Sequence, residues 1–214
     1  MDMSILGFYA NMKMLEQKDV FRHFFCSLSK ERQQKIEAIK AEGGRCSSLG
    51  AWALMDYGLQ QLYGLREREI TITYGAHGKP YVKNRPDIHF NLSHSGDYVL
   101  AVFAPVDVGC DVQQVTQDTR SKRIAARFFT EKEQMAIADG MDFYRIWVRK
   151  ESYIKCTGDG MACDLRSFSV EEEKNIHFAE HILPGYAMAV CCKKGVPPVV
   201  WKKVDLSNLI ENEV

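Results

Sequence analysis

The order of apolar and polar positions in the first half of the chain predicts a strand, then helices, then more strands. A short apolar run at 5–9 is typical of a buried strand. Ser29 can cap a helix that runs through Ile36 and Ile39, and a second helix has apolar residues at helical spacing over 49–62. Three β-rich runs separated by turn-forming residues follow, and they cover 70–74, 88–92 and 98–104.

The second half shows a similar order of elements. An apolar strand is expected at 106–112, and Thr130 with Glu133 fits a capping box, which satisfies free amides at a helix start. Another helix is expected from about Asp142 to Cys156. Runs of β character come last, and they cover 168–170, 186–192 and 199–204. We therefore expect an α+β fold of two similar α/β units, residues 1–106 and 107–214, that repeat element order and not sequence.

The composition is that of a folded globular chain, and its charge excludes some classes of partner. The 214 residues include 28 Lys and Arg against 28 Asp and Glu, so the formal net charge is zero. A protein that binds nucleic acid or an anionic membrane through charge usually has a basic excess, so we expect neither partner. The longest apolar run, at 98–104, is far shorter than the roughly 18 residues that a membrane-spanning helix needs.

The cysteine pattern favours a reducing environment. The seven cysteines form no C-x-x-C pair and no zinc-type pattern with histidines. The first four residues show no basic region that leads into an apolar one, so no secretory signal is expected. We expect reduced thiols in a cytoplasmic protein, with most cysteines acting as packing residues.

Two pairs of residues are candidates for metal and catalytic chemistry. Asp111 and Gln113 lie two apart at the end of an apolar strand, so they present two hard oxygens on one face, which suits Mg²⁺. The alternative is a strand that leaves the core through a polar edge. Glu151 and Lys155 lie four apart on an apolar-periodic helix and share a face, where the alternative is a surface ion pair.

Other polar positions are less distinctive when taken alone. Ser93 and His94 lie in the polar run 91–96 at a strand end, which could meet a phosphate or simply form a hairpin turn. Lys79 lies in a Gly-Lys-Pro turn, and Arg45 lies near a helix start.

Five motifs in order are much more informative than any one of them. Between about Arg45 and Phe168 the chain closely resembles the 4′-phosphopantetheinyl transferases of the surfactin-synthetase-activating (Sfp-like) type. The motifs are Gly78-Lys-Pro80, Phe90-Asn-Leu-Ser-His-Ser95, Val108-Gly-Cys-Asp111, Phe128-Phe-Thr-x-x-Glu133 and Trp147-x-x-Lys-Glu-Ser-x-x-Lys155. The last of them is the most specific.

The resemblance implies a reaction, a fold and a set of partners. Members of this family transfer the phosphopantetheine arm of coenzyme A to a serine of an apo acyl or peptidyl carrier protein. They release adenosine 3′,5′-bisphosphate and use Mg²⁺, for which Mn²⁺ can substitute. The implied fold is two α/β units related by a pseudo-twofold axis within one chain, with coenzyme A and metal in the cleft between them. Such an internal pseudo-dimer is expected to be a monomer.

The resemblance also implies roles for individual residues. Asp111 and Glu151 are expected to bind the metal, and Lys155 falls on a lysine at the active centre that also contacts coenzyme A. Glu151 is a candidate to accept the proton of the attacking serine. Contacts to the adenosine phosphates are expected from Arg45, Lys79, Ser93 and His94.

One position departs from the family pattern, which commonly reads Asp-x-Glu after the strand. Gln113 stands at the second acidic position and offers a neutral carboxamide oxygen. It is expected to bind the metal directly or through a water, with a higher Mg²⁺ requirement than Gln113→Glu would have.

Partner recognition and two alternative functions stay open at this stage. Residues 120–155 hold nine basic and five acidic side chains, which suits an acidic carrier protein, while Phe128 and Phe129 could dock a partner or fill the core. One alternative is a degenerate family member that binds coenzyme A or a carrier protein without transfer. The other is an unrelated Mg²⁺-dependent phosphodiesterase.

Overall fold

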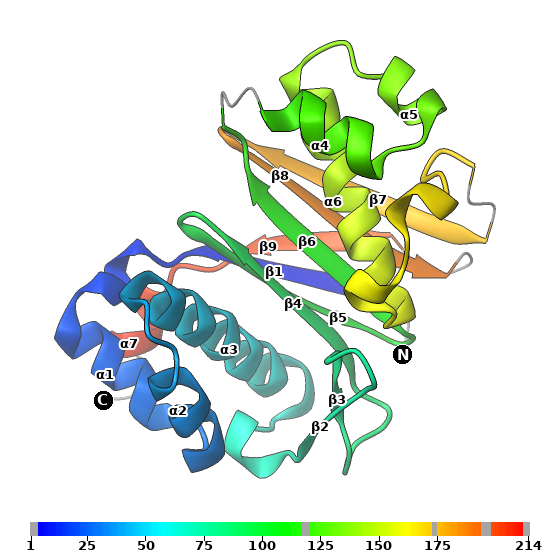
Figure 1. The fold of residues 1–214 in the computed structure, drawn as a ribbon. Coiled ribbons are helices and arrows are strands. Elements are labelled where there is room, and N and C mark those ends of the chain that lie inside the picture. Colours follow the sequence, from blue (N-terminus) through cyan, green and yellow to red (C-terminus); the bar gives the residue numbers. More distant parts are fainter. Residues whose placement is uncertain (1–3, 117–119, 173–174, 194–197, 212–214) are drawn as a thin grey trace.

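Two units, each with a long helix packed on a β-sheet, make up the computed structural model, which describes residues 4–116, 120–172, 175–193 and 198–211 (Figure 1). The first sheet has the strand order β4 (His89–Ser95), β5 (Tyr98–Ala104), β1 (Ile5–Asn11) and β9 (Val199–Lys203). The second has the order β6 (Val108–Gln114), β8 (Tyr186–Lys193) and β7 (Ile176–Leu183). The long helices are α3 (Glu42–Tyr63) and α6 (Gly140–Thr157).

The two units repeat one topology. In the first, β5 lies between β1 and β4 and pairs with both in antiparallel fashion. In the second, β8 lies between β6 and β7 and again pairs with both in antiparallel fashion. The order β1, α3, β4, β5 thus recurs as β6, α6, β7, β8. The expected α+β fold of two similar units is confirmed.

Alternation along the strands produces a layered arrangement. Phe8, Ala10 and Phe103 face α3 in the core of the first unit. Their neighbours on the other face of the sheet, such as Tyr9 and Leu100, pack instead against the second sheet. The order of layers is therefore α3, first sheet, second sheet and α6.

Local signals in the sequence set the ends of the helices. Ser29 accepts a hydrogen bond from the Arg32 amide and caps α2 (Lys30–Glu37), as predicted, although this helix ends before Ile39. The predicted capping box of Thr130 and Glu133 begins α5 (Glu131–Met135). Asp139 caps α6 through the amides at 141 and 142, and α6 ends at Gly158, whose φ of 82° is one that glycine adopts at no steric cost. The remaining helices are α1 (Lys18–Ser27), α4 (Arg120–Phe128) and α7 (Ser207–Glu211).

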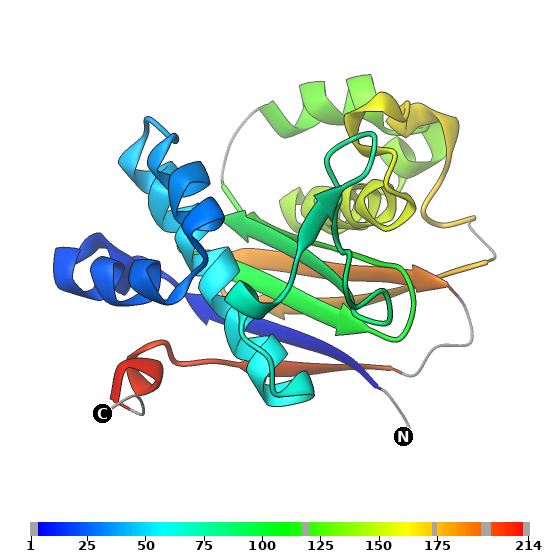
Figure 2. The same ribbon diagram turned by 90° about the horizontal axis from the view of Figure 1, so that it is seen from below.

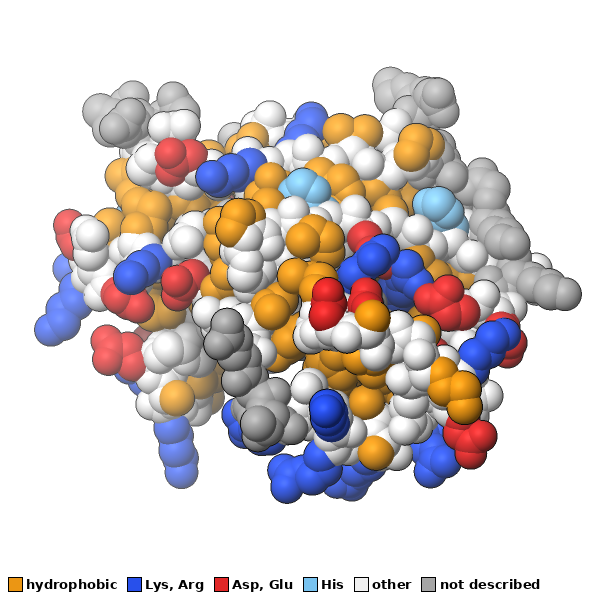
Figure 3. All heavy atoms as spheres, turned by 90° about the horizontal axis from the view of Figure 1, so that it is seen from above, with side chains coloured by type: hydrophobic (Ala, Val, Ile, Leu, Met, Phe, Trp, Pro, Cys, Tyr) orange, Lys and Arg blue, Asp and Glu red, His pale blue; other side chains and the backbone are white. Residues whose placement is uncertain are grey.

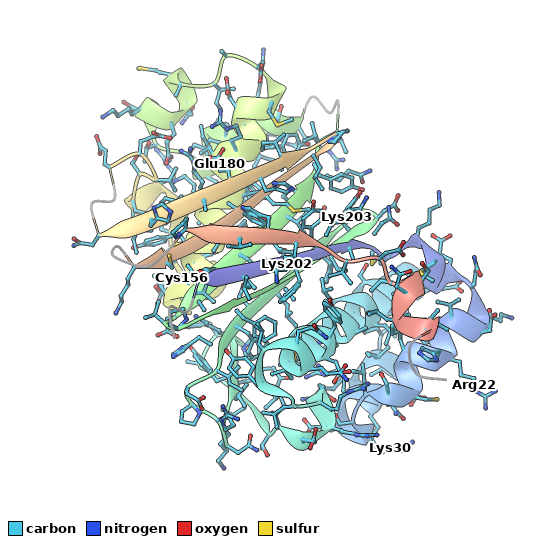
Figure 4. The ribbon with its side chains drawn as sticks, turned by 180° about the vertical axis from the view of Figure 1, so that it is seen from behind. Arg22, Lys30, Cys156, Glu180, Lys202 and Lys203 are labelled. Carbon is cyan, nitrogen blue, oxygen red and sulfur yellow. The ribbon has the colours of Figure 1, made fainter. Side chains whose placement is uncertain are left out.

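The last strand returns to the first sheet. β9 pairs in parallel with β1, with Ile5 opposite Val199, and the two lie side by side in Figure 2. Its outer edge has no further strand among the described residues, and the strand carries Lys202 and Lys203, which Figure 4 labels. Charged side chains of this kind protect a sheet edge from pairing with another chain. That the two units divide at residue 106 stays a prediction, since β9 comes from the second half of the sequence but joins the first sheet.

One predicted strand is wrong. Residues 168–170 lie outside any strand, because Phe168 offers its carbonyl to Lys150 and Val170 offers its amide to Glu133. The strand of this region is β7, whose mixed run of apolar and polar residues lacks a clear period. A short hairpin of β2 (Ile72–Tyr74) and β3 (Pro80–Val82) completes the described strands.

Within the described ranges, no helix combines the length and apolar character needed to cross a bilayer. All seven cysteines are free thiols, and five of them are buried. Residues 1–3, part of the stretch tested for a secretory signal, lie outside the described residues.

Candidate active site

The two sheets meet along a seam between the edge strands β4 and β6. Alternate polar side chains of β4 accept hydrogen bonds from alternate amides of β6. These bonds join Cys110 N to Asn91 Oδ1 (2.9 Å), Val112 N to Ser93 Oγ (3.2 Å) and Gln114 N to Ser95 Oγ (3.0 Å). Residues 91–95 of the polar run thus belong to a strand that joins the two units, and its hydroxyls have structural partners; only residue 96 lies in the hairpin turn.

Small residues on the second sheet bring α6 very close to it. A Cβ on Gly109 would lie 2.0 Å from the Ser152 carbonyl and 2.3 Å from the Cys156 amide. Ala187 and Ala189 of β8 pack under the same helix. The backbone of α6 therefore lies against β6, and its side chains reach those of β6 directly.

This close packing assembles a buried cluster at the seam. Lys155 Nζ lies 2.7 Å from Asp111 Oδ1 and donates to Ser93 Oγ at 3.0 Å. Ser93 Oγ in turn donates to Asp111 Oδ1 at 2.8 Å. The Asp111 side chain is 3% exposed and the Lys155 side chain 29%. Burial alone would lower the pKa of Lys155, but Asp111 and the neighbouring acids hold it above its usual value.

Glu151 and Gln113 complete the polar cluster. Burial raises the pKa of Glu151, and the negative charge of Asp111 adds to the rise. Gln113 donates through Nε2 to Asp111 Oδ2 at 3.3 Å and accepts at Oε1 from the Ser95 hydroxyl at 3.4 Å. The i, i+4 pair of Glu151 and Lys155 is therefore no simple surface ion pair, because Lys155 bonds to Asp111 of β6 and Glu151 lies within the field of both charges.

His94 and Lys79 border this cluster. The surrounding protein atoms and the positive charge of Lys155 lower the pKa of His94, although this residue is exposed to solvent. Lys79 is buried and donates from Nζ to the Cys156 carbonyl at 2.8 Å, with Asp107 3.8 Å away. A lysine at the last carbonyls of a helix is favoured by the helix dipole, so Lys79 also links the first unit to the end of α6.

Arg45, unlike the other predicted site residues, has a side chain whose partners among the described residues are all nearby in the sequence. Its guanidinium donates to the carbonyls of Ile39 and Lys40, at 3.1 and 3.2 Å, in front of α3. Arg32, another basic residue of this region, lies over the Trp52 ring at 3.3 Å and bonds the Tyr74 hydroxyl.

Two cavities flank the cluster. One of ≈ 230 Å³ is lined by His77, Lys79, Asn91 and Lys155, among others. The other, of ≈ 400 Å³, is lined by Ser95, Gln113, Ile124 and Trp147, among others. Because Asn91 and Ser95 stand at opposite ends of the seam, the cluster of Asp111 and Lys155 lies between the two cavities.

An ion pair that the sequence does not predict supports α6 from its other side. Glu133 and Lys150, both with 0% exposed side chains, lie 2.9 Å apart. Lys150 also donates to the carbonyls of Leu165 and Phe168. A glutamate in a capping box looks locally satisfied in a sequence. Glu133 and Lys150 each belong to one of the five motifs, but no pattern in the sequence shows that they pair.

The donor set fits a magnesium ion. No group of three His, Cys, Asp or Glu side chains gathers as a metal site within the described ranges. Mg²⁺, however, needs only one or two carboxylates, since water and substrate phosphates fill its other positions. Asp111 and Glu151 supply two carboxylates, and their mutual repulsion is a strain that a cation would relieve.

Comparisons with known proteins agree with this geometry. A family model described as the 4′-phosphopantetheinyl transferase superfamily matches residues 107–194, and one for the N-terminal part of 4′-phosphopantetheinyl transferases matches residues 16–105. The chain is 30% identical over 209 residues to the 4′-phosphopantetheinyl transferase Sfp of Bacillus subtilis, which covers 88% of this chain and 92% of that protein. It is also 30% identical over 164 residues to the 4′-phosphopantetheinyl transferase gsp of Aneurinibacillus migulanus, and this match covers 73% of this chain and 67% of that protein. The chain therefore belongs to the Sfp-like 4′-phosphopantetheinyl transferases.

Proposed function

We propose that the chain transfers the 4′-phosphopantetheine group of coenzyme A to a serine hydroxyl of an apo acyl or peptidyl carrier protein at the seam between β4 and β6. The observation that carries the proposal is the convergence of Asp111, Lys155 and Ser93 within 3.0 Å of one another, with Glu151 beside them. Two carboxylates and a partly buried lysine between two cavities suit the transfer of a phosphoryl group from one bound molecule to another.

The smaller cavity suits the nucleotide end of coenzyme A. Lys79 and Lys155 line it, and His94 stands beside Lys155. We assign the contacts to the adenosine phosphates to Lys79, Ser93, His94 and Lys155, with Arg45 at the start of α3 as a more distant contact. Ser93 would have to give up its hydrogen bond to Asp111 to donate to a phosphate. Lys79 would exchange its bond to the Cys156 carbonyl for a phosphate oxygen.

The chemistry needs a serine nucleophile and a stabilised leaving group. The serine oxygen forms a bond to the phosphorus next to pantetheine, and the diphosphate bond to the nucleotide breaks. Negative charge grows on the departing adenosine 3′,5′-bisphosphate, where Lys155 stabilises it. Glu151, which lies beside Asp111 at the proposed metal site, accepts the serine proton directly or through a water.

Asp111 and Glu151 would hold Mg²⁺ or Mn²⁺, which supplies charge neutralisation at the diphosphate. Gln113 replaces an acidic ligand, so it contributes an oxygen directly or through a water. We expect a Mg²⁺ titration of activity to need a higher concentration for the natural chain than for Gln113→Glu. Identical titration curves for the two proteins would contradict this role.

The larger cavity suits the carrier protein. It is bordered by α4, whose exposed residues include Lys122 and Arg123 and whose apolar side includes Ile124. An acidic carrier protein would meet a basic helix there, beside an apolar pocket. Phe129 belongs to the core, while Phe128 is half-buried against Trp147. We also propose that the protein is a monomer, because the second unit supplies within one chain the half of the site that a partner subunit would otherwise supply. We propose the cytoplasm as its location, which agrees with its free cysteine thiols.

The activity test is a mass measurement. The chain is incubated with coenzyme A, Mg²⁺ and a panel of apo carrier domains, and each carrier is weighed by mass spectrometry. We expect a gain of one phosphopantetheine group, which should disappear in Asp111→Asn. Asp205→Asn, an exposed change beside α7, is the matched control and should retain the transfer.

Two further results separate the alternatives. Coenzyme A binding without a mass gain on any carrier would favour the degenerate binding protein. Membership in the family already removes the unrelated phosphodiesterase. For Glu151→Gln, intact turnover together with normal Mn²⁺ affinity would exclude Glu151 as the base.

A further inference from the structure

We infer that Asn91 and Ser95 are positioning residues for the transfer reaction, because they hold β6 in the register that points Asp111 and Gln113 into the site. This inference rests on the proposed function for its meaning, since it concerns the same site. Neither residue needs to contact the substrate or the metal for this role. Their role is carried by hydrogen bonds to the backbone and side chains of β6.

The seam lacks the usual backbone ladder. β4 is an edge strand of the first sheet and β6 an edge strand of the second, and the structure gives them no backbone pairing along their described lengths. Side chains of β4 replace the missing carbonyl acceptors, at a constant offset of 19 residues along the chain. The period of two on one strand matches the period of two on the other, so a slip by one residue would break all three bonds.

This register decides where the side chains of β6 point. The amides of Cys110, Val112 and Gln114 are turned toward β4, and the side chains of Cys110 and Val112 fill the core between the sheets. The residues between them must then point to the opposite face. That face carries Asp111 and Gln113, and α6 lies over it.

The middle bond of the seam cannot fix this register alone. The Ser93 hydroxyl accepts from the Val112 amide and from Lys155 and donates to Asp111, which uses its one proton and both lone pairs. Any ligand that draws Lys155 away weakens this network. Asn91 and Ser95 bond β6 on either side and stay outside the contacts of Lys155, so they can hold the strand while Lys155 changes partner.

Ser95 has a second contact that reaches the site. Besides accepting from the Gln114 amide, its hydroxyl donates to Gln113 Oε1, and Gln113 Nε2 donates to Asp111 Oδ2. Loss of this hydroxyl would free the Gln113 carboxamide to turn and would leave the Asp111 carboxylate with one orienting contact fewer. Removal of a group that orients a metal ligand typically lowers metal affinity by about tenfold or more.

The test compares Ser95→Val with Ser95→Thr, two side chains of equal shape that differ in the hydroxyl. Mn²⁺ binding is measured by electron paramagnetic resonance on the whole chain, without coenzyme A or carrier protein. We expect Ser95→Thr to bind Mn²⁺ as the natural chain does and Ser95→Val to bind it about tenfold more weakly. Asn91→Leu, which removes the acceptor at the other end of the seam, should weaken Mn²⁺ binding as well.

The outcomes separate positioning from stability and from the activity itself. A melting temperature that falls in Ser95→Val while its Mn²⁺ dissociation constant equals that of Ser95→Thr would overturn the inference and leave a merely structural bond. A natural chain that binds no Mn²⁺ would overturn it too. If Mn²⁺ binding changes as expected but no carrier protein gains mass, the proposed function fails while the positioning role stands.

Discussion

Lys150→Met should destabilise the fold strongly, because it removes the cation from a buried ion pair. Lys150 and Glu133 have 0% exposed side chains and lie 2.9 Å apart. The remaining partners of Glu133 are the amides of Thr130 and Val170, each at 2.9 Å. Methionine has nearly the volume of lysine, so the change creates little empty space and acts mainly on charge.

The structure sets the size of the effect. Breaking a buried pair from one side typically costs about 3–5 kcal/mol, because the other charge stays buried and uncompensated. Two carbonyls, of Leu165 and Phe168, lose their donor at the same time. In a chain of this length each kcal/mol lowers the melting temperature by about 2–4 °C. We therefore expect a fall of roughly 6–20 °C for Lys150→Met.

Urea unfolding followed by tryptophan fluorescence measures the free energy, with two comparison variants. Lys132→Met breaks an ion pair in which the side chains of Lys132 and Glu172 are 68% and 60% exposed. It should lower the free energy of unfolding by less than about 1 kcal/mol. The double variant Glu133→Gln with Lys150→Met should lose less than the sum of the single changes, because no charge stays buried. Equal losses for Lys150→Met and Lys132→Met, or additive single changes, would refute the reasoning.

Three other changes test other parts of the structure. Gly109→Ala should push α6 away from the sheet, because its Cβ would lie 2.0 Å from the Ser152 carbonyl. We expect the free energy of unfolding to fall by about 1–3 kcal/mol, which differential scanning fluorimetry would show as a lower melting temperature, and we expect transfer to be lost. Lys155→Met should lower the turnover number by about a hundredfold or more while Mn²⁺ binding is kept or tightened, since the cation beside Asp111 is gone; unchanged turnover would contradict the role of Lys155. Burial lowers the pKa of His181 in the folded chain, so the unfolded chain binds its proton at a higher pH. This residue therefore lowers the free energy of unfolding as the pH drops below about 6.5. In His181→Gln, the free energies of unfolding measured in urea at pH 7.5 and at about pH 5.5 should differ less than in the natural chain.

Periodic patterns were enough to predict the elements that carry the site. Apolar runs located β5 and β6 to within two residues, and helical spacing located α3 and α6. Motif order then selected Asp111, Glu151 and Lys155, which the structure brings together at one seam. The prediction works here because each of these residues lies on a regular element, so its face follows from its position along the chain.

Contacts between distant segments were beyond such reasoning. That β9 joins the first sheet depends on a parallel pairing with β1 across almost the whole chain. The resemblance implies that Lys79 is a phosphate ligand, but a Gly-Lys-Pro turn gives no sign of its hydrogen bond to the end of α6. The false strand at 168–170 has the same origin, since its backbone bonds go to Lys150 and Glu133 and not to a neighbouring strand.

The zero net charge acquires a different meaning once the ion pairs are known. The segment 120–155 is basic by four charges and the segment 159–180 acidic by four, although Glu173 and Lys174 lie outside the described residues. Glu180, marked in Figure 4, pairs with Arg145 and Arg149 of α6, and Figure 3 shows acidic and basic side chains next to one another across the upper face.

This pairing narrows the surface that an acidic partner can use. Arg145, Arg149, Lys132 and Lys150 already have carboxylate partners within the chain. The basic residues of α4, Lys122 and Arg123 among them, are exposed beside the larger cavity. A carrier protein steered by charge should therefore depend on α4, so Arg123→Glu should raise its KM more at low salt than at high salt, while Arg145→Glu should act mainly on stability.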